Sequence, residues 1–222
     1  MTSPADQRRS WFWICLGLAS AFGLPELHLG RFLAPGQDLL SKGVGELIFW
    51  LIGLAIVGYV IAVERRPVSS IGLRQPDWKT FVYGLLGAIV MFASVILSFS
   101  LIFPLLGLKM NQQAMEQITS TPLWFQTLIF LRAGVVEEIL YRGYAIERLQ
   151  ELTGSKWIAA LLSIVIFTWA HLAGWGGAQL IVVALGTIIL ALLYLWRRDL
   201  ICNMLAHFLV DLAGFLAAGA HR

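Results

Sequence analysis

The sequence predicts an all-α fold, a polytopic transmembrane bundle of about seven helices. Of its 222 residues, 59% are hydrophobic and only 13% are charged, and the mean hydropathy is +0.78. A soluble domain of ordinary composition carries about 25% charged residues. Apolar runs also recur along the chain at lengths that suit a bilayer, which a helix crosses in roughly 17–25 residues. Open strands cannot span lipid, because their backbone polar groups would lack partners.

Seven apolar runs qualify as transmembrane helices. Residues 11–29, 45–63 and 81–104 form the first three, and residues 123–141, 156–172, 178–196 and 200–218 form the last four. Tryptophan rings anchor helices at the headgroup level; they stand near the ends of these runs at Trp11, Trp78, Trp124, Trp157, Trp175 and Trp196. The first run follows Arg8 and Arg9, as a signal peptide would, but we expect an uncleaved anchor in a polytopic chain.

Basic residues predict the orientation. With a cytoplasmic amino terminus, the cytoplasmic segments hold 11 Lys and Arg residues and the outer segments hold 4; with Arg132 inside the fourth run, this accounts for all 16. This asymmetry follows the positive-inside rule. We therefore expect a multi-pass integral protein of a bacterial-type plasma membrane, with the lipid bilayer as its partner. Because the basic residues lie in short loops, no nucleic acid is expected, and Cys15 and Cys202 lie in apolar runs that disfavour a disulfide.

The fourth run contains charges that a membrane helix rarely tolerates. Glu137 and Glu138 follow two valines, and Arg142 comes one helical turn later. A charge at the centre of a membrane helix costs roughly 2.5–3.5 kcal/mol on insertion scales. On an α-helix, Glu138 and Arg142 share a face and can form an ion pair, whereas Glu137 is rotated by about 100° and can face a different neighbour. The alternative is that all three only cap a helix emerging into the cytoplasm.

Two later runs carry histidines. The fifth ends with Phe167 and His171 on one helical stripe, and the seventh carries Asn203, His207 and Asp211 at successive spacings of four. Such polar groups turn towards the bundle interior, because lipid offers them no partner. Taken alone, His171 is typical of a hydrogen-bonded residue at a helix interface. The Asn–His–Asp row is typical of a polar seam that holds helices together. An acid and two imidazoles on separate helices are, alternatively, groups that activate water.

Taken in order, these three motifs resemble those of the CPBP intramembrane proteases. The motifs are Glu137-Glu138-x-x-x-Arg142, Phe167-x-x-x-His171 and His207-x-x-x-Asp211. This family, also called Abi, includes the type II CAAX prenyl endopeptidases and bacteriocin-processing or self-immunity proteins. The resemblance covers roughly residues 123–218. It implies one membrane domain with three amino-terminal helices in residues 1–106 and a four-helix catalytic core in residues 107–222.

The resemblance also implies roles for individual residues. Glu137, His171 and His207 would be catalytic, and Asp211 stands where the family has Asn or Asp. Because a carboxylate cannot donate as an amide does, we expect Asp211 to act as a ligand or to orient His207. Glu138, Arg142, Asn203 and Phe167 are expected to support the site.

Two mechanisms fit these residues. In one, Glu137, His171 and His207, with Asp211 as a possible fourth ligand, bind a divalent metal such as zinc that lowers the pKa of a bound water. In the other, Glu137 and His171 activate water directly, and a protonated His207 binds the oxyanion. Removal of Glu137 from water by burial would favour its role as a general base.

The expected activity is that of an intramembrane endopeptidase acting on small membrane-associated or CAAX-like peptides or proteins that enter from the membrane or the cytosol. Two non-enzymatic alternatives use the same residues: a catalytically silent immunity or scaffold protein, and a proton-coupled transporter. The sequence shows no paired halves of the kind that many transporters have.

The depth of the site depends on the fourth helix. His207 lies about 10 Å from the cytoplasmic end of its run and His171 more than about 20 Å, at 1.5 Å per residue. Glu137 can meet both only if the fourth helix continues into the cytoplasm, and we expect it to run through Gln150. Arg132 is expected to snorkel or to pair within the bundle. His28 and His221 are expected to be ordinary surface residues.

Overall fold

The computed structural model describes residues 4–219, with side chains for residues 11–217, and every regular element among them is a helix. The all-α prediction is confirmed. The helices are α1 (Pro4–Glu26), α2 (Leu29–Leu33), α3 (Leu39–Ala62), η1 (Val68–Ile71), α4 (Trp78–Leu97), η2 (Ser98–Ile102), α5 (Phe103–Leu106), α6 (Gln112–Thr119), α7 (Leu123–Arg132), η3 (Ala133–Ile146), α8 (Glu147–Thr153), α9 (Lys156–Ala170), α10 (Leu172–Trp175), α11 (Leu180–Arg197) and α12 (Leu200–Gly219). His28 is exposed, as expected, whereas His221 lies outside the described residues.

Local sequence signals set several helix ends. The Asp38 side chain accepts hydrogen bonds from the first backbone N–H groups of α3, and Asp77 and Thr80 form a capping box at the start of α4. The hydrogen bond from the Thr80 backbone N–H lowers the pKa of the Asp77 carboxyl group. At the other ends, Gly107 and Gly154 follow α5 and α8 with φ of 63° and 71°, a conformation that glycine adopts without a steric penalty.

Among the residues that the structure describes, five helical stretches are long and apolar enough to cross a membrane. They are Leu39–Ala62, Trp78–Leu106, Lys156–Trp175, Leu180–Arg197 and Leu200–Ala217. The helix of the fourth predicted run is not among them, because Arg132, Glu137 and Glu138 make it too polar by composition, and α1 is not among them either. The predicted count of seven spans is therefore not confirmed.

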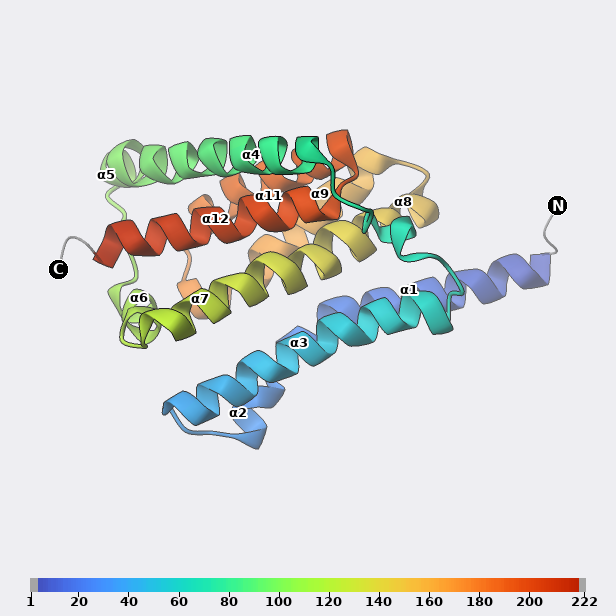
Figure 1. Cartoon of the computed structure of the whole chain (residues 1–222), viewed down its shortest axis with the longest axis horizontal. Helices are drawn as coiled ribbons and strands as arrows, with labels where there is room; N and C mark the ends of the chain where they lie inside the picture. The colour runs from blue at the N-terminus through green and yellow to red at the C-terminus, as the bar shows by residue number, and fades with distance from the viewer. Residues whose placement is uncertain (1–3, 220–222) are drawn as a thin grey trace.

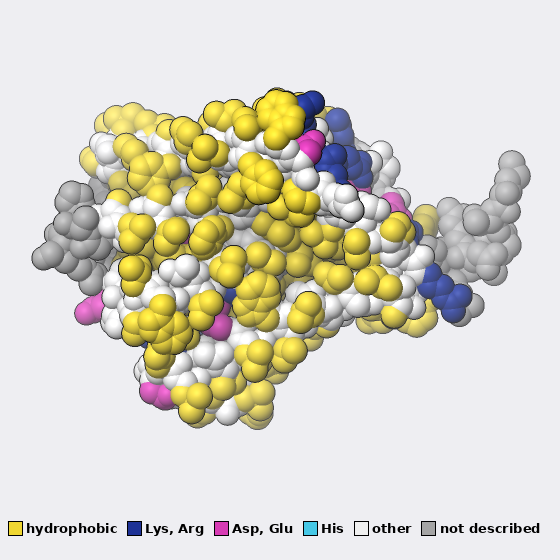
Figure 2. Space-filling model, in the orientation of Figure 1, with side chains coloured by type: hydrophobic (Ala, Val, Ile, Leu, Met, Phe, Trp, Pro, Cys, Tyr) yellow, Lys and Arg dark blue, Asp and Glu magenta, His cyan; other side chains and the backbone are white. Residues whose placement is uncertain are grey.

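The long helices run roughly along one axis of the molecule (Figure 1). Helices α4, α12 and α11 lie together, α7 and η3 pack beside α12, and α1 and α3 lie on the far side of η3. Hydrophobic side chains cover most of the visible face, whereas Lys and Arg gather near the beginnings of α4 and α12 (Figure 2). Apolar exterior surface of this extent is what a lipid-facing bundle requires.

The predicted fourth helix is longer than its apolar run. Helices α7, η3 and α8 continue without a break from Leu123 to Thr153, which confirms the expected extension through Gln150. In Figure 1, α8 and the adjoining end of α9 reach beyond the beginnings of α4 and α12. This offset lets His171, far along α9, lie at the same depth as His207, which is near the start of α12.

The middle of this helix departs from α geometry. Ala133–Ile146 is a π-helix, in which each backbone N–H bonds to the carbonyl five residues earlier instead of four. Wide turns of this kind are frequent at functional sites. They also change which side chains share a face. Residues five apart lie about 140° from each other on an α-helix, whereas the wider π-helical turn brings them towards one face.

Two helices approach closely at a glycine in this π-segment. A Cβ atom at Gly134 would lie 2.9 Å from Phe208 N and 3.0 Å from Met204 O, both on the backbone of α12. Because backbone atoms cannot turn away as a side chain can, glycine is required for η3 and α12 to pack at this distance.

We predict that Gly134→Ala destabilises the protein by about 1–3 kcal/mol, the usual cost of overpacking. Gly58→Ala is the matched control, because nothing lies within 4 Å of a Cβ at that position in α3; it is expected to be neutral or to stabilise by up to about 1 kcal/mol. Unfolding in detergent micelles measures both. Equal stabilities for the two variants would contradict the close packing of η3 on α12.

Candidate active site

The two adjacent glutamates of η3 face different partners, as the sequence predicts. Glu138 is fully buried, and its Oε1 atom accepts hydrogen bonds from Arg142 Nη1 and His207 Nδ1, each at 2.8 Å. Asn203 Nδ2 approaches the other oxygen, Oε2, at 3.3 Å. Glu138 thus joins η3 to two residues of α12, and the predicted Glu138–Arg142 ion pair is confirmed.

Arg142 is held on all sides. Its side chain is 1% exposed, its Nη2 donates to Thr187 Oγ1 of α11 at 2.6 Å, and its guanidinium lies 4.3 Å from the centre of the Phe167 ring. A buried charge is tolerated only when it is paired and its donors are satisfied. The helix-end alternative is therefore wrong for Glu138 and Arg142, which lie inside the bundle.

Glu138 orients His207. Because the Glu138 carboxylate can only accept a hydrogen bond, Nδ1 of His207 must be the protonated ring nitrogen that donates it. The other ring nitrogen, Nε2, then lies 3.6 Å from Asp211 Oδ2. The sequence predicts that Asp211 acts as a ligand or orients His207, but the shorter contact that sets the ring direction comes from Glu138.

Glu137 belongs to a second group. Its Oε1 accepts a hydrogen bond from Arg132 Nη1 at 2.7 Å, and its Oε2 lies 3.8 Å from His171 Nε2. His171 Nδ1 is 2.8 Å from the carbonyl oxygen of Phe167, and the two rings stack with centroids 4.4 Å apart. Since that carbonyl can only accept, Nδ1 donates, and Nε2 of a neutral His171 presents a lone pair towards Glu137.

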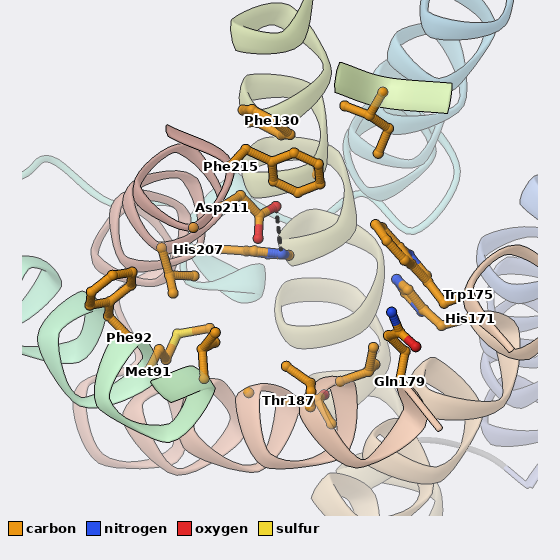
Figure 3. Close-up of a pocket in the computed structure, with 18 of the residues that line it drawn as sticks. Met91, Phe92, Phe130, His171, Trp175, Gln179, Thr187, His207, Asp211 and Phe215 are labelled. Carbon is orange, nitrogen blue, oxygen red and sulfur yellow. Dashed lines mark ion pairs between the residues drawn. The ribbon is translucent and has the colours of Figure 1, made fainter. Parts of the chain in front are cut away.

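The two groups meet at one cavity of about 700 Å³ (Figure 3). Glu137, His171, His207 and Asp211 all line it, from η3, the end of α9 and α12. Figure 3 shows the paired His207 and Asp211 on one side and His171 on the other. Apolar side chains of α4 and α6, such as Phe92 and Met115, form much of the remaining wall.

The structure also places the supporting residues. Phe167 lines the cavity beneath His171, whereas Glu138, Arg142 and Asn203 lie behind its wall. The cavity is thus polar where Glu137, His171, His207 and Asp211 line it, with Arg132, Gln179, Thr187 and Ser100 as further polar groups, and most of its remaining wall is apolar. Such a site can hold a hydrophobic peptide next to a carboxylate and two imidazoles.

Two polar residues of this region, Glu46 and Gln179, were not predicted, whereas the expected pairing of Arg132 within the bundle is confirmed. Arg132 pairs with Glu137, and Glu46 of α3 pairs with Arg132 at 2.8 Å. Gln179, just before α11, lines the cavity with its Nε2 atom buried and without a partner, while its Oε1 accepts the Asn111 N–H. Glu46 could have been found in the sequence, as Arg132 was, as a charged residue inside an apolar run. Nothing in the sequence around Gln179 indicated its place at the cavity.

The predicted metal site does not fit this arrangement. Among the described residues, no group of three or more His, Cys, Asp or Glu side chains could hold a metal ion. Zinc needs three or four such ligands at about 2.0–2.2 Å from one point, and the bonds to Arg132 and Glu138 leave Glu137 only its Oε2 and His207 only its Nε2 to bind one. The chemistry of the site is therefore derived from its side chains alone.

Comparison with known families agrees with these motifs. Residues 119–213 match the family model described as type II CAAX prenyl endopeptidase Rce1-like. The match contains all three motifs, from Glu137 to Asp211, and it leaves out α1, α2, α3 and α4. No curated protein and no solved structure matches the chain.

The family model that matches describes endopeptidases. The five apolar helices among the described residues make this chain an integral membrane protein. Glu46 belongs to α3 and so contacts the Rce1-like part from outside the matched residues.

We predict that Arg142→Met lowers the free energy of unfolding by about 3–5 kcal/mol, because it leaves the Glu138 carboxylate buried with one cation fewer. Arg66→Met is the control, since Arg66 and its partner Glu151 are about one-third exposed; its cost should be about 0–1 kcal/mol. Denaturant unfolding in detergent measures both. A loss at Arg142 no larger than that at Arg66 would contradict the central role of the buried pair.

Proposed function

We propose that the protein is an intramembrane endopeptidase that hydrolyses small membrane-associated or CAAX-like substrates with a water activated by Glu137 and His171. The observation that carries the proposal is the separation of 3.8 Å between Glu137 Oε2 and His171 Nε2 at the cavity wall. This is too long for a direct hydrogen bond, and a water molecule beside both groups can bond to each.

The reaction follows from these positions. The water oxygen attacks the scissile carbonyl carbon while its proton passes to Glu137, with His171 holding the water by its Nε2 lone pair. The carbonyl oxygen becomes an oxyanion, and His207 donates to it from Nε2 when the ring is protonated. The C–N bond then breaks, the proton on Glu137 moves to the leaving amine, and the products are a carboxylate and an amine.

Substrate class and orientation are part of the same proposal. The apolar cavity wall favours a hydrophobic peptide that enters from the membrane or the cytosol. The end of the bundle where Lys and Arg gather, near the beginnings of α4 and α12, is assigned to the cytoplasm (Figure 2). The beginning of α1 then lies on the cytoplasmic side (Figure 1), in keeping with the expected cytoplasmic amino terminus. A bacterial-type plasma membrane remains the expected location. No feature of the described residues favours the scaffold or transporter alternatives over hydrolysis.

Glu137→Ala is predicted to abolish cleavage of a hydrophobic peptide reporter while leaving the melting temperature within a few degrees of the wild-type value. The fold is expected to survive because Arg132 keeps Glu46 as its partner. Cleavage in proteoliposomes and thermal unfolding give the two readouts. Turnover at the wild-type rate in this variant would remove the proposed role of Glu137 and, with it, the proposed enzyme.

Chelation gives a separate test of the zinc prediction. Since the described side chains are not arranged as a group of three metal ligands, we expect cleavage by the purified protein to persist after prolonged dialysis against a strong chelator. Elemental analysis of the dialysed sample is the necessary control. Loss of activity on dialysis, with recovery on addition of zinc but not of magnesium, would show instead that the four residues rearrange around a metal.

A further inference from the structure

We infer that Glu46 is a positioning residue of the active site: it holds Arg132, and Arg132 in turn fixes the side chain of Glu137. The inference rests on the proposed function of Glu137 as the general base. It makes α3, which lies outside the residues that match the Rce1-like family, part of the catalytic machinery.

The geometry begins with the π-segment. Arg132 and Glu137 are five residues apart and would point about 140° away from each other on an α-helix. Arg132 ends α7 and η3 begins at the next residue, so the wide turn brings the two side chains to one face. Nη1 of Arg132 reaches Glu137 Oε1 at 2.7 Å. The α-helical spacing that the motif suggested therefore could not reveal this pair.

Glu46 binds the other side of the same guanidinium. Its Oε2 accepts from Arg132 Nε at 2.8 Å and its Oε1 from Nη2 at 3.4 Å, and the planar group lies 4.6 Å from the centre of the Phe49 ring. Arginine presents its donors in a rigid fork, so two acids on different edges define its plane. Arg132 is thus clamped between α3 and η3.

This clamp determines which oxygen of Glu137 is free. With Oε1 bonded to Arg132, Oε2 is left on the side of His171. The side chains of Arg132, Glu137 and Glu46 are only 12%, 15% and 20% exposed, so water competes weakly for these bonds. If Glu46 lost its charge, the guanidinium would have one acid partner, and both of its outer nitrogens could turn to Glu137.

The alternative is that Glu46 has a purely structural role and only connects α3 to the rest of the bundle. Lys42 provides a matched control for it, because Lys42 Nζ on the same helix donates to the Gln117 carbonyl of α6, away from Glu137. A variant of Lys42 removes this contact between α3 and α6 and leaves the contacts of Arg132 with Glu46 and Glu137 intact.

The experiment compares Glu46→Gln, Glu46→Asp, Arg132→Ala and Lys42→Met in proteoliposomes. The probe is a quenched fluorescent peptide that ends in a farnesylated cysteine and three further residues, with its unprenylated form alongside. A displacement of about 1 Å in a catalytic group costs about 100-fold in rate. We expect kcat to fall by about 10- to 100-fold in Glu46→Gln and Arg132→Ala, with KM within about twofold of the wild type.

Rescue separates positioning from structure. Free guanidinium can enter the cavity that Arg132 lines, and it should restore part of kcat in Arg132→Ala but not in the Arg132→Ala/Glu46→Gln double variant. Glu46→Asp should recover part of the activity that Glu46→Gln loses. Lys42→Met should keep the wild-type kcat.

Three outcomes would overturn the inference: wild-type kcat in Glu46→Gln, an equal loss of kcat in Lys42→Met, or no rescue by guanidinium. Glu137→Ala separates these outcomes from failure of the proposed function. If the wild type cleaves a probe and Glu137→Ala does not, the proposed function stands and the result for Glu46 decides the inference alone. If the wild type cleaves neither probe, both fail together.

Discussion

Charged groups inside an apolar bundle must be paired, and this requirement organises the carboxy-terminal half of the protein. Glu138 meets it with three partners: Arg142 on its own helix, and Asn203 and His207 on α12. Arg142 extends the network to Thr187 on α11. Because lipid offers no substitute for any of these bonds, the helices can associate in only one register without leaving a charge unsatisfied. That register places His207 at the cavity.

The adjacent glutamate, Glu137, has different partners, and this difference indicates that the two glutamates have different roles. Glu138 is fully buried behind the wall and has no free oxygen directed at the cavity, whereas Glu137 lines the cavity with Oε2 facing His171. One residue therefore maintains the fold and the other is available for chemistry. The π-helical turn of η3 makes this possible, since it aligns Arg132 with Glu137 while Arg142 stays aligned with Glu138.

Sequence reasoning found what depends on local spacing and composition. Wholly apolar runs of bilayer length gave the long helices, and spacings of four gave the Glu138–Arg142 pair and the shared face of Asn203, His207 and Asp211. It missed what depends on backbone geometry and on distant segments. On an α-helix, Arg132 and Glu137 would point in different directions. Nothing in the motifs indicated that Glu46, 86 residues before Arg132, also forms an ion pair with it. Gln179 gave no signal because it stands alone before an apolar helix.

The central claim is that Glu137 and His171, from different helices, meet at one cavity in the membrane. It is tested most directly by cross-linking single cysteines placed at positions 137 and 171, with Cys15 and Cys202 replaced by alanine. A short bifunctional thiol reagent applied to native membranes should join the two positions within one chain, as shown by protease cleavage in the intervening loop followed by electrophoresis. Two cysteines that each react with the reagent but are never joined would contradict the shared cavity.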